Sequence, residues 1–181
     1  MKIFVASDIH GSAYFCQKML DYFKREKADK LLLLGDILYH GPRNDLPKDY
    51  NPKAVIQMLN EYKDSIICVE GNCDSDVDRM VLQFPLIPVL STILTENYYI
   101  VATHGHIYNP EQLPPMNPGD ILLYGHTHIP DFVVKNGMLI ANPGSVSIPK
   151  ADSHNGYLLI NNNDMIWKDF EGNIIDKKSI R

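Results

Sequence analysis

Five short apolar runs of this sequence are each followed, within a few residues, by a polar side chain that can bind a metal ion. The runs are residues 3–6, 31–34, 66–69, 100–102 and 121–124, and the polar residues that follow them are Asp8, Asp36, Asn72, His104 and His126. Four of the seven histidines lie in two tetrapeptides, residues 103–106 and 125–128. Carboxylate, amide and imidazole groups are ligands for divalent metal ions. The pattern therefore predicts a metal site that is assembled from distant parts of the chain.

The apolar runs are the elements that must position these side chains. Runs rich in Ile, Leu and Val are typical of buried parallel strands, and ligands of open α/β sheets bind beyond the carboxyl ends of such strands. Asp8 and His10 are two residues apart at a strand end, so their side chains point in the same direction. Gly35 and Gly71 precede two of the polar residues and let the backbone turn sharply there. Turn formation alone would explain each glycine and the polar residue after it, but the recurrence of polar residues after five apolar runs favours one shared crevice.

The first half of the sequence alternates between strand and helix patterns, whereas the second half contains strands and turns. Ser12 is a suitable N-cap for a helix, and Asn136-Gly137 predicts a hairpin. The expected elements are strand 2–7, helix 12–27, strand 30–34, helix 53–63, strand 65–70, and then strands 86–94, 97–103, 120–124, 130–135, 138–141, 157–161 and 164–168. We expect one α/β domain over residues 1–181, with two packed mixed β-sheets, a β-sandwich, flanked by α-helices.

Composition and charge argue against several classes of partner. Hydrophobic residues make up 45% of the chain, and no apolar run approaches the roughly 20 residues of a membrane span. The net charge of −5 argues against binding of duplex DNA through a basic face. Asp8 interrupts the first apolar run too early for a signal peptide, and Cys16, Cys68 and Cys73 form no Cys-x-x-Cys pair. We therefore expect reduced thiols and a cytoplasmic protein with no membrane or duplex nucleic-acid partner.

The polar motifs, taken in order, resemble the signature of the calcineurin-like metallophosphoesterases. The motifs are Asp8-Ile9-His10, Gly35-Asp36, Gly71-Asn72, His104-Gly105-His106 and Gly125-His126-Thr127-His128. Residues 39–44, 71–74 and 142–147 further resemble the small bacterial phosphodiesterases of the YfcE type. This resemblance implies a β-sandwich flanked by helices, in a four-layer arrangement, with a two-metal centre at one edge.

The resemblance also implies which residues hold two divalent metal ions. One ion would be bound by Asp8, His10, Asp36 and His128, and the other by Asp36, Asn72, His104 and His126. Asp36 would bridge the ions, because each of its carboxylate oxygens can face one cation. Oxygen and imidazole ligands without a thiolate suit several transition metals, among which we expect Mn²⁺, with Zn²⁺, Fe²⁺, Co²⁺ and Ni²⁺ as alternatives. His106 is assigned no ligand role.

The expected reaction is hydrolysis of a small or activated phosphodiester by a hydroxide that bridges the two ions. Asn72 could hold a phosphoryl oxygen. Arg43, in the long loop of residues 39–52, could clamp the phosphate, although a solvated loop arginine is the alternative. Cys73 occupies the position at which many members of the superfamily carry a His that assists the leaving group, and Asp74 follows it. These four are the predicted catalytic residues.

Two other functions are compatible with the sequence. A retromer subunit with this fold is a protein-binding scaffold with a vestigial metal site, and a nuclease acting on short single strands would use the same chemistry. All seven ligand positions carry competent side chains, which favours an enzyme. The sequence has no long basic segment interleaved with aromatic residues, which argues against a nuclease. The resemblance finally implies a homo-oligomer, a dimer or larger.

Overall fold

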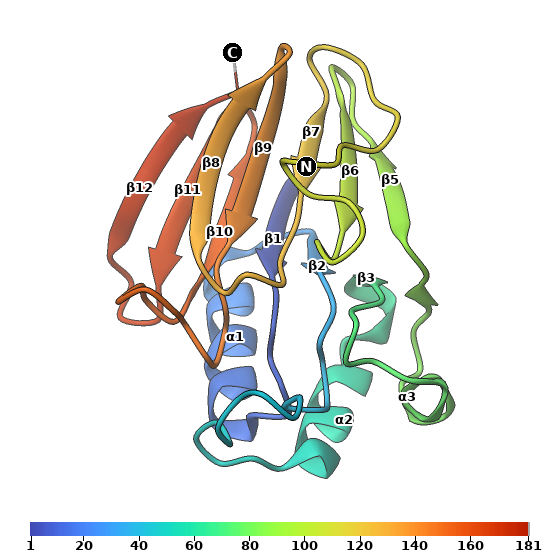
Figure 1. Cartoon of the computed structure of the whole chain (residues 1–181). Coiled ribbons are helices and arrows are strands. Elements are labelled where there is room, and N and C mark those ends of the chain that lie inside the picture. Colours follow the sequence, from blue (N-terminus) through green and yellow to red (C-terminus); the bar gives the residue numbers. More distant parts are fainter. Residues whose placement is uncertain (181) are drawn as a thin grey trace.

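The computed structural model describes residues 1–180, and within them it forms two β-sheets and three α-helices (Figure 1). One sheet has seven strands in the order β12-β11-β10-β1-β2-β3-β4, and the other has five in the order β5-β6-β7-β9-β8. The elements are β1 (Lys2–Ala6), α1 (Ala13–Glu26), β2 (Lys30–Leu33), α2 (Pro52–Asn60), β3 (Ile66–Val69), α3 (Asp76–Val81), β4 (Leu86–Ile87), β5 (Leu90–Leu94), β6 (Tyr99–Thr103), β7 (Ile121–Leu123), β8 (Pro130–Lys135), β9 (Met138–Pro143), β10 (Gly156–Asn161), β11 (Asp164–Asp169) and β12 (Ile174–Ser179).

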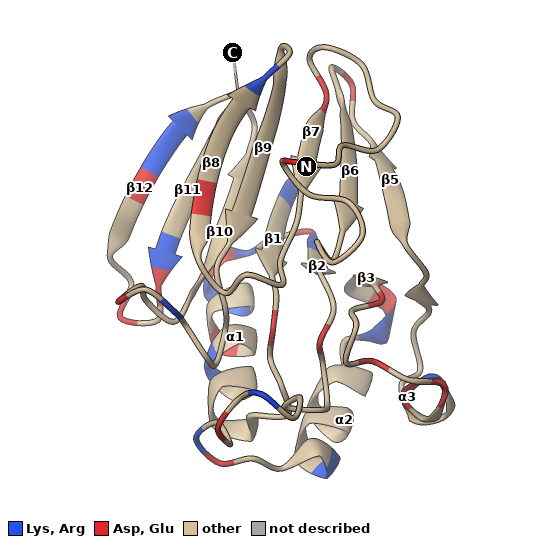
Figure 2. Cartoon of the chain, in the orientation of Figure 1, with Lys and Arg blue, Asp and Glu red and all other residues tan. Residues whose placement is uncertain are grey.

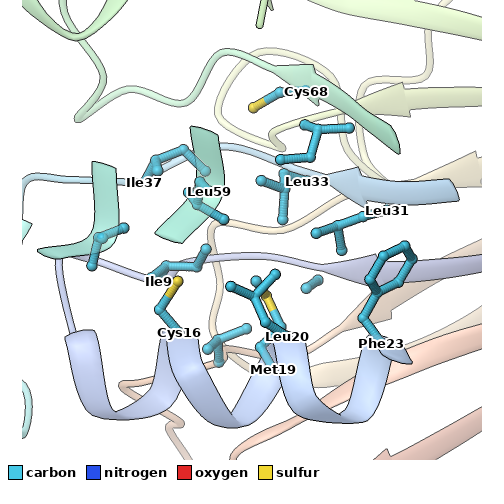
Figure 3. Packing of buried hydrophobic residues seen from close by; sticks show 14 of the residues in the cluster. Ile9, Cys16, Met19, Leu20, Phe23, Leu31, Leu33, Ile37, Leu59 and Cys68 are labelled. Atoms are coloured by element: carbon cyan, nitrogen blue, oxygen red, sulfur yellow. The ribbon is translucent and has the colours of Figure 1, made fainter. Parts of the chain in front are cut away.

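The helices connect the parallel strands of the seven-stranded sheet, and α1 and α2 bury its outer face. The hydroxyl of Ser12 accepts a hydrogen bond from the Phe15 N–H, so α1 begins where the sequence predicts. Behind this cap, Met19 and Leu20 lie on the apolar face of α1 and pack beneath Leu31 (Figure 3). This packing is that of an amphipathic helix whose apolar face is turned toward the sheet.

A second apolar layer fills the space between the two sheets. It combines residues of the first sheet, such as Leu32 and Trp167, with residues of the second sheet, such as Ile100 and Leu123. On the other face of the second sheet a small cluster that includes Tyr124 packs against Leu113 and Met116. These two residues belong to the long connection between β6 and β7. The predicted sandwich of two mixed sheets is confirmed. It differs from the expected four layers in one respect: among the described residues, the outer face of the second sheet is covered by a connecting segment and not by a helix.

Several elements differ from the sequence-based expectation. The single strand expected over 86–94 is divided into β4 and β5, because Pro88 cannot donate a ladder hydrogen bond and Val89 has a φ of 67°. Two elements, α3 and β12, were not expected. None of the described helices has the length and apolar character that a membrane crossing requires.

The two sheets bring the carboxyl ends of their parallel strands to one edge. In the first sheet β1, β2 and β3 are parallel, and in the second sheet β6, β7 and β9 are parallel. Acidic residues occur in the segments that leave the ends of β1 and β2 (Figure 2). Across the sheets, the His126 N–H donates to Asp8 Oδ2 over 3.1 Å. The predicted ligands of both sheets therefore meet at this edge.

Candidate metal centre

The first group of predicted ligands comprises Asp8, His10 and His128. Asp8 and His10 follow β1, and His128 follows β7, yet the three side chains meet in the buried edge of the sandwich. The Nε2 atoms of His10 and His128 lie 3.6 and 3.4 Å from Asp8 Oδ1, respectively. They lie 3.2 Å from each other. One small cation between these atoms would contact all three residues.

The second group lies beside the first and shares Asp36 with it. Asp36 Oδ2 is 3.4 Å from His104 Nε2 and 3.7 Å from His10 Nε2. Asn72 Oδ1 and His126 Nδ1 approach the same His104 Nε2 atom, at 3.1 and 3.3 Å. The Asp36 carboxylate therefore stands between two groups of ligand atoms.

The histidine rings are oriented with a lone pair toward the site. Nδ1 of His10, His104 and His128 lies 2.7, 2.7 and 2.6 Å from the backbone carbonyls of Tyr39, Leu34 and Ile148. A carbonyl oxygen only accepts, so each Nδ1 carries the proton and each Nε2 is free to bind a metal. His126 differs, because its Nδ1 atom is the one that faces the site and His104 Nε2.

The charges of the site also fit a divalent cation. Asp8 Oδ1 is buried and has no hydrogen-bond partner within residues 1–180, although it faces two imidazole nitrogens. Burial lowers the pKa of His104, but the neighbouring Asp36 and Asp8 carboxylates outweigh it and raise the pKa to about 9. Buried carboxylates that stabilise the positive charge of a neighbouring imidazolium are equally suited to stabilise a metal cation. The donor set, oxygen and imidazole nitrogen, fits the expected class of metal.

The backbone that carries these ligands is held in an uncommon conformation. Five of the seven have a positive φ, between 49° and 68°: Asp8, His10, Asp36, His126 and His128. Such left-handed residues cost free energy and persist only where surrounding contacts determine them. Two such contacts are the hydrogen bonds from the Asp8 N–H to the Gly35 carbonyl and from the His10 N–H to the Asp36 carbonyl. These hydrogen bonds therefore fix the backbone of the segments that carry Asp8, His10 and Asp36.

Asp74, one of the predicted catalytic residues, binds the backbone of two loops at the site. Its carboxylate accepts hydrogen bonds from the backbone N–H groups of Asp36, Ile37 and Gly71, at 2.8, 2.8 and 2.7 Å. These donors belong to the two loops that carry Asp36 and Asn72. With its oxygens engaged by the backbone, Asp74 is placed to position these two loops. Its predicted catalytic role stays a prediction.

Beside the predicted ligands lies a cavity of about 400 Å³. It is lined by Asp36, Gly41, Pro42, Arg43, Asn44, Asn72, Cys73, His126, Thr127, His128 and Lys150. Arg43 and Cys73 therefore lie beside the predicted ligands, and so does Lys150, to which the sequence analysis gave no role. His106 is exposed and does not line the cavity. A larger cavity of about 590 Å³, beside Leu94 and Tyr98, contains none of the predicted site residues.

The thiol of Cys73 is half-buried in this cavity. It lies in one group with His10 and Asp36, whose potential ligand atoms are within 4.8 Å of one another. Burial, together with the adjacent Asp36 carboxylate, raises the pKa of Cys73 to about 12. Without a bound cation the thiol is therefore neutral and a weak proton donor at pH 7.

Comparison with known proteins identifies the family. The family model for the calcineurin-like phosphoesterase superfamily domain matches residues 1–165, and the chain belongs to this superfamily. It is 45% identical to phosphodiesterase YfcE of Escherichia coli (strain K12) over 162 residues, which make up 90% of this chain and 88% of that protein. A solved structure of the E. coli phosphoesterase YfcE has a TM-score of 0.97 at 42% identity and is covered over 100% of both chains. A structure of Vps29 from Entamoeba histolytica with Zn²⁺ has a TM-score of 0.64 at 18% identity over 100% of both chains, which shows a shared fold.

These similarities confirm the resemblance to the YfcE type that the motifs indicate. The protein is an enzyme of the phosphoesterase class, and its clustered carboxylates and histidines fit the divalent metal ions that a metallophosphoesterase requires.

Proposed function

We propose that the protein hydrolyses small phosphodiesters with the help of two divalent metal ions. The observation that carries this proposal is the position of Asp36 Oδ2, which faces His10 Nε2 on one side and His104 Nε2 on the other. One ion would be held by Asp8, His10, Asp36 and His128, and the second by Asp36, Asn72, His104 and His126. When bound, the ions would lower the pKa of a water molecule, the nucleophile, and would neutralise charge on the phosphoryl oxygens.

The residues of the chain would bind and orient the substrate in the adjacent cavity. The Asn72 side chain is exposed there, and its amide can donate to a phosphoryl oxygen. Arg43 lines the same cavity, and its guanidinium group can donate two parallel hydrogen bonds to one phosphate. No covalent intermediate with the protein is needed.

Cys73 would limit which leaving groups the enzyme can expel. A thiol, with an ordinary pKa of about 8.5, protonates a departing alkoxide less readily at neutral pH than an imidazolium does. We expect efficient turnover of aryl or otherwise activated diesters and slow turnover of alkyl diesters. Replacing Cys73 with His should raise the rate for alkyl diesters by roughly tenfold or more, since a positioned imidazolium is a better acid.

Cys73→Ser is the matched control for this change, because a hydroxyl has a similar size and is no better acid. Steady-state rates for one alkyl and one aryl diester, with metal content measured in each variant, give the comparison. An unchanged or lower alkyl-ester rate in Cys73→His protein with intact metal content would contradict the assignment.

The main experiment measures metal content and substrate class together. Protein treated with a chelator should lose hydrolysis of bis(4-nitrophenyl) phosphate, and addition of Mn²⁺ should restore it as about two ions bind per chain. The diester should be hydrolysed faster than 4-nitrophenyl phosphate. Saturation at one ion per chain would contradict the two-metal centre. Loaded protein without hydrolysis would favour a scaffold, and comparable turnover of single-stranded DNA would favour a nuclease.

We further propose Mn²⁺ as the metal, a cytoplasmic location and a homo-oligomeric state. The mixed oxygen and imidazole donors support the first. Three free cysteines, two of them buried, are compatible with a reducing compartment. Elemental analysis of native protein and light scattering would test the first and third of these assignments.

A further inference from the structure

Lys150 is a cation of the active-site cavity that the proposed mechanism does not use. It is exposed and lines the same cavity as Arg43 and Cys73. The ion pairs of residues 1–180 engage other cations, such as Arg79 and Lys168, and include neither Lys150 nor Arg43. Both side chains therefore face the cavity without a carboxylate partner from the described part of the chain.

The backbone around Lys150 is tied to a predicted metal ligand. The Lys150 N–H donates to the carbonyl of His128 over 3.2 Å. Two residues earlier, the carbonyl of Ile148 accepts from His128 Nδ1 over 2.6 Å. On the other side, Ser153 Oγ donates to the Lys150 carbonyl over 2.6 Å. The base of the side chain thus has a set position relative to the metal centre, unlike that of a lysine on a free loop.

The charge of a simple phosphodiester does not account for Lys150. Two divalent ions against the carboxylates of Asp8 and Asp36 leave a local charge of about +2, and Arg43 adds a further positive charge at the phosphate. A phosphodiester carries one negative charge. Among the described residues that line the cavity, Asp36, a predicted metal ligand, is the only acidic one. Lys150 is thus an additional cation in a protein whose net charge is −5.

The rest of the surface does not share this arrangement. Lys and Arg residues are spread over several elements, including α1, β11 and β12, and acidic residues lie among them (Figure 2). A continuous basic track of the kind that follows a polynucleotide backbone would place such residues along one groove. The positive charge of the cavity is therefore local, and its volume of about 400 Å³ is that of a small-molecule site.

We infer that the substrate is a small phosphodiester with a second anionic group, a phosphate or a carboxylate, on one ester arm, and that Lys150 binds this group. The inference rests on the proposed function and names the substrate class of the same site. The scissile phosphate would lie at the ions and Arg43. The second anion would reach Lys150 in a partly enclosed cavity, where the attraction between charges is stronger than in bulk water.

The experiment compares three nitrophenyl diesters with the same leaving group. Their second arms are ethyl, 2-carboxyethyl and 2-phosphonoethyl, so the last two add an anion and also distinguish a carboxylate from a phosphate-like group. We expect the wild-type enzyme to have an approximately tenfold higher kcat/KM for at least one anionic arm than for the ethyl arm. High salt should reduce this preference, because it screens the added charge.

Variants then assign the preference to Lys150. Lys150→Met, which keeps the length of the side chain, should reduce the preference about tenfold, mainly through KM, whereas Lys150→Arg should retain most of it. Lys135→Met is the matched control, because Lys135 is exposed at the hairpin end of β8 and contacts Pro110, away from the cavity. Calorimetric binding of non-hydrolysable phosphonate analogues of the same compounds should follow the same order.

Each outcome bears on the inference. A wild-type enzyme that hydrolyses all three diesters equally would contradict it and leave the proposed function intact. Equal losses for all three substrates in Lys150→Met would also contradict it, since they would indicate a general role at the phosphate or in the fold. Metal-loaded protein that hydrolyses none of the three would contradict the proposed function and this inference together.

Discussion

The helix-covered core and the metal edge of the same sheet follow different physical rules. In the core, the rings of Phe4 and Tyr157 stack with centroids 4.1 Å apart, and apolar side chains are removed from water. At the edge, Asp8 and His10 are equally buried, but they are polar and their backbone is left-handed. Burial stabilises the first region, whereas the second costs free energy through desolvation and backbone strain.

This difference predicts a separation of effects. Substitutions in the core should lower stability and leave the chemistry of the folded protein unchanged. Substitutions at the edge should act on metal binding and turnover, with smaller effects on stability. Four changes test this separation, beginning with the largest expected effect.

Asp36→Asn should lower turnover of an activated diester at least about a thousandfold, which corresponds to roughly 4 kcal/mol of transition-state stabilisation. The amide keeps an oxygen that can accept the hydrogen bond from the Cys73 N–H, at 2.8 Å in the native protein, but it removes the negative charge between the two ligand groups. Steady-state kinetics, elemental analysis and circular dichroism measure the three consequences. Wild-type turnover in the folded variant would refute the bridging role.

Leu20→Ala should lower the free energy of unfolding by about 2–5 kcal/mol, because it leaves a cavity beneath the sheet. Leu20 is 1% exposed and lies among the side chains of α1 that face β2 (Figure 3). Urea unfolding gives the stability, and kcat/KM of the folded variant should stay within about twofold of wild type. A large loss of kcat in Leu20→Ala protein without loss of stability would contradict the proposed distinction between the core and the metal edge.

Gly71→Ala should weaken metal binding and lower stability by roughly 1–3 kcal/mol. A Cβ atom at this position would lie 2.2 Å from Asp36 Oδ1 and 2.5 Å from the Asp36 nitrogen, so the ligand loop must move. Gly119→Ala is the contrasting control, because its Cβ would meet nothing within 4 Å and only its φ of +94° is unfavourable. We expect the control to cost about 1 kcal/mol and to leave the metal content unchanged, as elemental analysis and thermal unfolding can show.

Glu26→Gln should lower stability by about 1–3 kcal/mol at neutral pH, through a polar contact of the core region. Glu26 accepts a hydrogen bond from the Tyr157 hydroxyl over 2.9 Å and pairs with Lys168. Burial raises the pKa of Glu26, but these two partners outweigh it and hold the pKa below its usual value.

A carboxyl group whose pKa is lowered on folding stabilises the protein above its unfolded pKa of about 4.3. The difference between wild type and Glu26→Gln should therefore be complete at pH 7 and shrink as the pH falls below about 4. Chemical unfolding across this range provides the test, and a difference that grows toward acid pH would contradict it. Turnover at pH 7 should be unaffected.

Local patterns were sufficient for most elements of the fold. The Asn136-Gly137 turn predicted a hairpin after a strand over 130–135, and β8 is Pro130–Lys135. The cap at Ser12 and the helical spacing behind it predicted α1 to within a residue at each end. Both signals are short-range, so they can be read without knowledge of the packing.

The unexpected elements lack such signals. The helix α3 has six residues, of which only Asp78 is buried, and depends on a capping box between Ser75 and Asp78. The strand β12 is an edge strand that is mostly exposed and has no apolar alternation. Their formation depends on the neighbouring elements rather than on their own sequence pattern.

The positions of individual side chains divide in the same way. The sequence by itself determined which side chains could bind metal and that they follow strands. Only the tertiary structure placed His10 Nε2 3.2 Å from His128 Nε2. It also placed the Asp74 carboxylate within hydrogen-bond distance of the backbone of two loops, and Lys150 at the cavity. The reason is that His10 and His128 are 118 residues apart, and a contact over that distance depends on how the two sheets pack against each other, which no local pattern of residues encodes.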